Sequence, residues 1–268
     1  MMRTLSGACA ALLVGLFLFP LAWMAIASLR PEAQLFGAAS AGQVSATHYR
    51  ALFDERAFAV PIRNSLIVAG LTTAIALPVA ALCAYALARL RMRGKTVLLA
   101  LVLAVSMFPQ IAVIAPLYLI LRELRLIDTY PGLVLPYVTF ATPLAIWLLT
   151  GFFRQLPREL EDAAVIDGAS RLRALRDIVL PLAGPALAST AILTFLYCWN
   201  EFLFALSFTV SPERHTVPVS IALFRGRYQV PWGQILAAAV VATIPVAVIV
   251  LAFQRRIVAG LTAGSVKG

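Results

Sequence analysis

Six long apolar stretches determine what this chain can fold into. Each holds roughly 20 or more residues, and a helix of about that length crosses the ~30 Å hydrocarbon layer of a bilayer at ~1.5 Å per residue. The stretches are 7–29, 66–88, 97–121, 133–153, 182–208 and 235–253. The alternating ten-residue segments typical of an outer-membrane barrel are absent. The sequence therefore predicts an all-α membrane protein: one domain, residues 1–268, with six transmembrane helices.

Composition excludes the other broad classes. Hydrophobic residues make up 62% of the chain and charged residues 13%, whereas soluble proteins have about 45–50% and 25%. A mean hydropathy of +0.91 also excludes a disordered chain, because disorder requires low hydrophobicity. The formal net charge of +10 does not indicate nucleic-acid binding, since the basic residues form short clusters between the apolar stretches.

The cysteines and histidines indicate no metal or disulfide site. Cys9, Cys83 and Cys198 lie inside apolar stretches and form no CxxC pair. His48 and His215 lie far apart in polar loops, without the spacing of metal ligands. We expect both histidines to be surface residues.

Lys and Arg predict the orientation in the membrane. Of the 22 basic residues, thirteen fall on the side that holds both termini and the segment 154–181, and nine on the other side. Cytoplasmic loops carry the excess of Lys and Arg, so both termini are expected in the cytoplasm. The first stretch exceeds the ~7–15-residue apolar region of a signal peptide and is expected to remain as a helix. Prolines within the stretches predict kinks; they are Pro20, Pro78, Pro109, Pro116, Pro143 and Pro245.

The segment 154–181 carries the most information. It reads RQLPRELEDAAVIDGASRLRALRDIVLP, with five basic and five acidic residues. Pro157 suits the first turn of a helix that ends at Ile166, and Gly168 provides a left-handed stop. Ser170 can cap a second helix that runs to Pro181. The pattern predicts a helix–turn–helix outside the membrane, either an amphipathic hairpin on lipid headgroups or a docking element for a cytoplasmic partner. Balanced charge favours docking, because an anionic leaflet attracts an excess of Lys and Arg.

The same segment resembles the EAA motif of ABC-importer permeases, EAA-x3-G-x9-I-x-LP. The matching residues are Glu161-Asp162-Ala163-Ala164, Asp167-Gly168-Ala169 and Ile178-x-Leu180-Pro181, with Asp162 taken as the first Ala of the motif. Leu172 and Leu175 replace aromatic residues sometimes found downstream. Supporting stretches are Met107-Phe108-Pro109, Pro131-Gly132-Leu133, Trp199-Asn200-Glu201-Phe202 and the tail 254–268. Together they resemble the binding-protein-dependent carbohydrate importers of the maltose and trehalose type.

The resemblance implies a mechanism and partners. In such importers the hairpin sits in a cleft of an ATPase subunit, where Ala164 allows close approach, Gly168 a sharp turn, and Glu161 an ion pair with the partner. The implied coupling residues are Glu161, Asp162, Ala163, Ala164, Asp167 and Gly168. The implied partners are a second related permease, two ATPase subunits that bind ATP and Mg²⁺, and an extracytoplasmic sugar-binding protein. The implied location is the plasma membrane of a prokaryote.

The chain itself is not expected to be an enzyme or to bind a cofactor. It lacks a Walker A pattern, a nucleophile elbow and an HExxH motif. An ion-coupled secondary transporter would show several ionisable groups inside the membrane, but Glu201 is the one acid within an apolar stretch. A purely structural scaffold would leave the EAA segment unexplained.

Three polar residues are candidates for a translocation path: Gln110, Asn200 and Glu201. The alternatives are a carboxylate held by its neighbours at Glu201 and a helix–helix hydrogen bond at Gln110. The expected substrate is a disaccharide such as trehalose or maltose, and a glycerol phosphate ester or another small solute is the alternative. The tail 261–268 is expected to affect the partner ATPase, and a frayed terminus is its alternative interpretation.

Overall fold

The computed structural model describes residues 2–35, 44–224 and 230–262, which form helices and turns without a strand. The α-helices are α1 Met2–Ser28, α2 Thr47–Asp54, α3 Ala59–Arg89, α4 Lys95–Ser106, α5 Gln110–Glu123, α6 Tyr130–Gln155, α7 Glu159–Ile166, α8 Arg171–Ala174, α9 Leu180–Leu182, α10 Gly184–Trp199, α11 Leu203–Phe208, α12 Val217–Ala222 and α13 Trp232–Thr262. A π-helical turn, Leu175–Val179, joins α8 to α9. The end of the tail, 263–268, lies outside the described residues.

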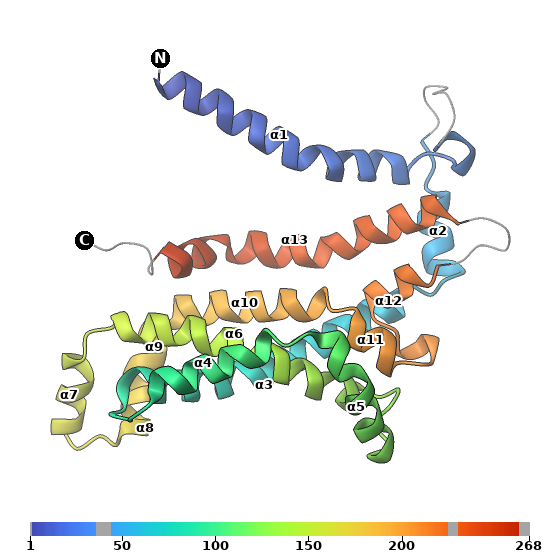
Figure 1. The fold of residues 1–268 in the computed structure, drawn as a ribbon. Coiled ribbons are helices and arrows are strands. Elements are labelled where there is room, and N and C mark those ends of the chain that lie inside the picture. Colours follow the sequence, from blue (N-terminus) through green and yellow to red (C-terminus); the bar gives the residue numbers. More distant parts are fainter. Residues whose placement is uncertain (1, 36–43, 225–229, 263–268) are drawn as a thin grey trace.

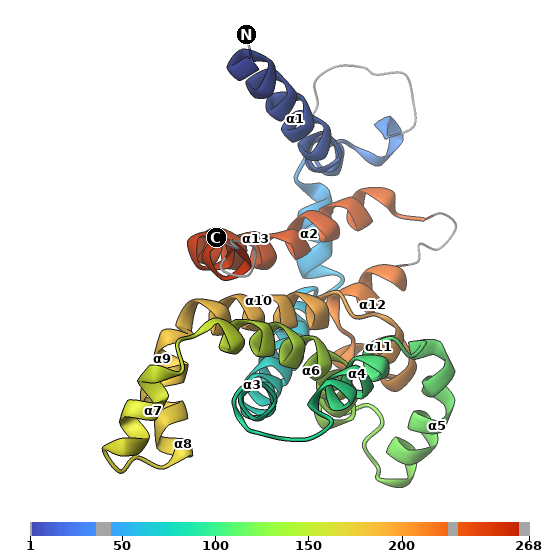
Figure 2. The same cartoon turned by 60° about the vertical axis from the view of Figure 1, so that its left-hand side comes forward.

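The long helices lie roughly along one axis, which gives the molecule two ends. Figure 1 shows α7 and α8 at one end and α2, α11 and α12 at the other. The start of α1 and the end of α13 point toward the end that holds α7 and α8. In Figure 2, α7 and α8 project from a corner of the bundle, and α9 leads back to α10.

Helix length and composition support a membrane protein. Three helices are long and apolar enough to cross a bilayer, namely Ala59–Arg89, Tyr130–Gln155 and Trp232–Gln254. Two bent helix pairs raise this number to five if each pair is one span, and Leu12–Ser28 is a shorter apolar helix. The all-helical membrane class is confirmed, while the number of six spans stays a prediction.

The stretch 97–121 is not the single helix expected from the sequence. It is divided between α4 and α5, whose axes differ by 84°. Pro109 has no backbone N–H to donate and disfavours the helical conformation at Phe108. The chain therefore leaves the helix after Ser106 and starts again at Gln110. The predicted kink at Pro109 is a full break.

The stretch 182–208 is also divided. The helical segment before Gly184 meets α10 at 80°, and residues 200–202 separate α10 from α11. Gly184 and Pro185 open α10, where the missing N–H of proline costs nothing. The helix between these breaks has 16 residues, about 24 Å of length.

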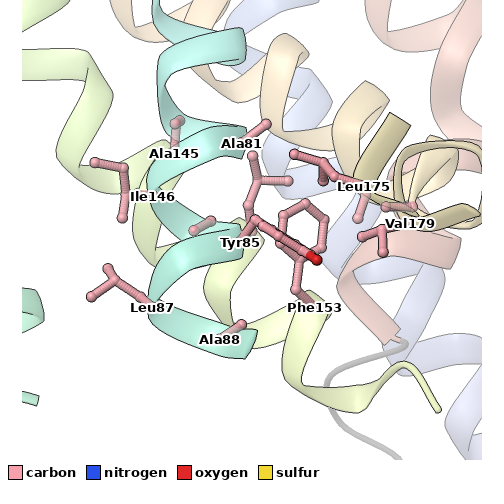
Figure 3. Close-up of a cluster of buried hydrophobic side chains, with 14 residues drawn as sticks. Ala81, Tyr85, Leu87, Ala88, Ala145, Ile146, Phe153, Leu175 and Val179 are labelled. Carbon is pink, nitrogen blue, oxygen red and sulfur yellow. The ribbon is translucent and has the colours of Figure 1, made fainter. Parts of the chain in front are cut away.

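Helices α3 and α6 form the core of the bundle. Their contact is rich in small side chains, which let helix backbones approach closely in a membrane; the buried alanines of the two helices are Ala69, Ala76, Ala80, Ala81, Ala84, Ala88, Ala141 and Ala145. Toward α7 and α8 this contact widens into an apolar cluster (Figure 3). There Tyr85 of α3 and Phe153 of α6 lie beside Leu175 and Val179.

At the opposite end of the bundle, hydrogen bonds join segments that are distant in the sequence. The Asp128 carboxylate accepts hydrogen bonds from the backbone N–H of Val210 (2.9 Å) and Ser211 (3.1 Å) and from the Ser211 hydroxyl (2.6 Å). The Asn64 amide of α3 donates to the carbonyls of Glu213 (2.8 Å) and His215 (2.9 Å). The segment after α11 is thereby tied to the starts of α3 and α6.

The expectation of a surface position is wrong for His48. Its side chain is buried, with Nε2 2.9 Å from the Arg30 carbonyl, and it packs against the backbone of Gly233. Helix α2 packs against α13, and this placement buries a residue that looked polar and exposed in the sequence. His215 is half-buried.

The Asp128 contacts predict a pH-dependent stability. Burial alone would raise the pKa of Asp128, but the hydrogen bonds from Ser211 and Val210, together with nearby Arg214, hold that pKa below its usual value. A lowered folded-state pKa stabilises the protein above the ordinary carboxyl pKa of ~3.9, and this contribution is lost as the pH falls below it. Asp128→Asn should lower the melting temperature by about 2–4 °C at pH 7, and this difference should shrink toward zero in acid.

Thermal unfolding of the purified protein in detergent measures this difference. Asn accepts the left-handed backbone at position 128, where φ is 63°, so the substitution changes the carboxylate and not the turn. A difference that is equally large at acid and neutral pH would contradict the assignment.

Candidate functional site: a helix–turn–helix and a cavity between broken helices

The helix–turn–helix expected within 154–181 is present. Helix α7 ends at Ile166, Gly168 has a φ of +85°, and the Ser170 hydroxyl accepts a hydrogen bond from the N–H of Arg173 as the cap of α8. The stop at Gly168 and the cap at Ser170 are confirmed. Pro157 lies two residues before α7 rather than in its first turn.

The outer face of this element combines acids with apolar side chains. Asp162, Ala163, Asp167 and Gly168 are exposed, and Ala164 is half-buried. Four large apolar side chains are also exposed, namely Leu160, Val165, Ile166 and Leu172. An exposed apolar patch bordered by charge is typical of a protein-interaction surface.

Glu161 does not belong to this exposed face. Its side chain is 9% exposed, and its Oε1 lies 2.7 Å from Nε of Arg89, whose side chain is 3% exposed. The Tyr85 hydroxyl donates to Oε2 of Glu161 over 3.1 Å. The expected ion pair between Glu161 and a partner protein therefore does not fit, because this carboxylate is already paired within the chain.

The motif spacing agrees with this correction. In the form EAA-x3-G, the acid stands six residues before the glycine, and six residues before Gly168 is Asp162. Asp162, Ala163 and Ala164 then occupy the triplet, and Glu161 precedes it. The exposed acid of the motif is Asp162, and taking Glu161 for it was wrong.

The three path candidates lie together at the helix breaks. Gln110, Asn200 and Glu201 line one cavity of about 550 Å³. Gln110 is the first residue of α5, directly after the break at Pro109, and the other two follow the end of α10. Two breaks that are far apart in sequence thus meet at one cavity. Its remaining lining residues are Leu193, Leu196, Tyr197, Phe202 and Leu203.

The hydrogen bonds distinguish the roles of these residues. The Gln110 amide donates to the Tyr197 hydroxyl over 2.6 Å, which joins α5 to α10. The buried Glu201 carboxylate accepts from the N–H groups of Phe204 (2.8 Å) and Ala205 (3.1 Å) and so caps the start of α11. The alternative interpretation of Glu201, a carboxylate held by its neighbours, fits this geometry.

Several site residues were not predicted from the sequence. Tyr197 and Phe202 flank the polar pair Asn200-Glu201, and aromatic residues beside polar ones inside an apolar stretch are the signal that could have indicated them. Arg89 and Tyr85 gave no such signal. Among the described residues, no group of three or more His, Cys, Asp or Glu could hold a metal ion.

Comparisons with known proteins agree with the resemblance seen in the sequence. Residues 76–262 match the family described as binding-protein-dependent transport system inner membrane component. The trehalose transport system permease protein SugB of Mycobacterium tuberculosis is 46% identical over 96% of this chain and 95% of its own. The trehalose/maltose transport system permease protein MalG of Thermococcus litoralis is 42% identical over 94% and 92%.

A solved structure shares the fold. A chain of a bacterial ABC transporter involved in the import of the acidic polysaccharide alginate superposes with a TM-score of 0.76, at 24% identity, over 95% of this chain and 97% of that one. The resemblance to the carbohydrate-importer permeases is confirmed.

The turn at Gly168 yields a direct test of the hairpin. A Cβ at this position would meet no atom within 4 Å, so a substitution acts only through the left-handed backbone. Gly168→Val should destabilise the turn by about 1–2 kcal/mol, whereas Gly168→Asn should be tolerated. Hydrogen exchange of the amides in 159–174 measures the effect. Equal exchange in the two variants would mean that the left-handed turn does not hold the hairpin.

Proposed function

Because the chain belongs to the family of inner membrane components of binding-protein-dependent transport systems, we propose that it is the transmembrane subunit of an ATP-driven importer for a disaccharide of the trehalose or maltose type. The near full-length match to a trehalose permease carries this proposal. The subunit works with a second permease, two ATPase subunits that bind ATP and Mg²⁺, and an extracytoplasmic sugar-binding protein.

The topology follows from the helices and the charge distribution. Helices α4 and α5 count as one broken span and α10 counts as another, because α8 belongs to the helix–turn–helix outside the membrane; α1 completes the six. The start of α1, the end of α13 and the helix–turn–helix share one end of the bundle, and the excess of Lys and Arg there supports a cytoplasmic location of that end.

The helix–turn–helix is the coupling element. Its exposed acids Asp162 and Asp167 offer negative charge to a basic surface, and Ile166 and Leu172 offer apolar area to a cleft of the ATPase. The small side chains of Ala163 and Ala164 let the partner approach the helix backbone closely. Gly168 makes the turn sharp enough to enter the cleft. Glu161 contributes to coupling without touching the partner, because its carboxylate is paired within the chain.

The cavity at the two breaks is a section of the translocation path. Substrate sites in transporters form where membrane helices are discontinuous, and here α5 and α11 both begin at the cavity. Gln110, Tyr197 and Asn200 can exchange hydrogen bonds with sugar hydroxyls, and Phe202 offers an apolar ring face. Glu201 shapes this wall by holding α11.

A reconstitution experiment tests the function. The chain alone should neither hydrolyse ATP nor accumulate sugar, because it lacks a phosphate-binding loop. Proteoliposomes that also contain the second permease, the ATPase subunits and the binding protein should take up labelled trehalose when ATP is present. Accumulation by the chain alone under a proton or sodium gradient would instead identify a secondary transporter.

The path assignment has its own test. Tyr197→Phe removes the hydroxyl that Gln110 contacts and should lower uptake by about two- to tenfold. Thr139→Ala is the matched control, because the Thr139 hydroxyl is exposed and bonds within its own helix. Uptake by the assembled complex measures both variants. If both transport like the wild type, the Gln110–Tyr197 pair is only a helix–helix contact.

A further inference from the structure

A buried ion pair joins the helix–turn–helix to the bundle. Arg89 is the last residue of α3, and its Nη2 donates to the carbonyl of Leu156, at the end of α6, over 2.8 Å. Its Nε lies 2.7 Å from Glu161 in the first turn of α7. The Tyr85 hydroxyl contacts Glu161 and also lies 3.3 Å from the carbonyl of Arg171 in α8. Four helices therefore meet at this pair.

The two halves of the helix–turn–helix are attached in different ways. The second half has an apolar anchor, since Leu175 and Val179 lie in the cluster beside Tyr85 and Phe153 (Figure 3). Helix α7 has no such anchor, because Glu161 is its one buried residue. Helix α7 packs against the π-helical turn, but its buried side chain is charged, so its direct attachment to the ends of α3 and α6 is through the charge pair.

The choice of a charge pair at this place requires a reason other than stability. A buried ion pair gains little net stability over an apolar pair of similar volume, because both charges must be desolvated. An ion pair does fix the distance and orientation of the two helices that it joins, because separating the charges inside the protein would leave each one buried without a partner, which is costly. Such a contact resists sliding of α7 along the ends of α3 and α6.

We propose that Arg89 is a positioning residue that holds α7 rigidly to the ends of α3 and α6 through Glu161, so that movement of the helix–turn–helix is passed to these two helices. This role rests on the proposed function, in which a partner ATPase moves the hairpin. Glu161 then acts in coupling through Arg89 and not through contact with the partner.

The first arm of the test needs no partner. Hydrogen exchange of the full chain in detergent should show about tenfold faster exchange of the α7 amides in Arg89→Met than in the wild type, because the anchor is lost. Exchange in Leu175–Val179 should stay unchanged, since the apolar cluster remains. Arg91→Met is the matched control, because Arg91 is exposed two residues further along the chain. Equal protection of α7 in the wild type and Arg89→Met would overturn the proposal.

The second arm measures coupling in the assembled importer. The amount of sugar taken up per ATP hydrolysed, normalised to assembled complex, should fall about five- to tenfold in Arg89→Met and in Glu161→Gln. Arg89→Lys keeps a cation beside Glu161 and should retain most of the wild-type ratio. A merely structural role would lower the amount of complex but leave this ratio unchanged, which would overturn the proposal.

The two arms separate the possible failures. If the wild-type chain associates with no ATPase subunit, the proposed function fails, while the exchange data still decide whether Arg89 anchors α7. If Arg89→Met and Glu161→Gln do not assemble, the Arg89→Lys variant decides whether the ion pair is needed for coupling. Loss of coupling in an Arg89→Lys complex that assembles normally would contradict the role of the ion pair.

Discussion

The need to satisfy every backbone hydrogen bond inside a membrane controls this structure. A free N–H or C=O in hydrocarbon costs several kcal/mol, so a membrane helix can break only where other groups replace the lost partners. At Pro109 there is no N–H to satisfy, and α5 starts directly after it. At 200–202 the Glu201 carboxylate takes the N–H groups of Phe204 and Ala205. Two such breaks meet at the cavity.

The features that the sequence predicts are those with local causes. The apolar stretches are continuous in the sequence, and the stop at Gly168 and the cap at Ser170 depend on residues within about one turn. The structure contains the stop and the cap and is helical in every stretch, although 97–121 and 182–208 are divided. The resemblance indicated the family for the same reason, since its motif is a short run of residues. Gln110, Asn200 and Glu201 stood out because polar side chains are rare in apolar stretches, although their meeting in one cavity required the fold.

The remaining features depend on contacts between distant segments. Pro109 breaks its helix, whereas Pro78 and Pro143 remain inside α3 and α6, so proline gives the place of a distortion while the neighbouring helices decide its size. Residues 89–95 contain four basic residues, Arg89, Arg91, Arg93 and Lys95, and nothing local shows that Arg89 turns inward to Glu161. His48 is buried for the same kind of reason, because α13 brings Gly233 against it.

The unbroken and the broken helices have different mechanical properties. Helices α3 and α6 are continuous between the two ends of the bundle: Tyr130 donates to Asn64 at one end, and Arg89 donates to Leu156 at the other. A continuous helix packed along its length moves as a rigid body, so a displacement at Arg89 reaches the segment held by Asn64. The helices around the cavity, α5, α10 and α11, are interrupted and can change their angles at the breaks. Under the proposed function, the continuous helices α3 and α6 would carry movement from the helix–turn–helix, beside the interrupted helices that line the cavity.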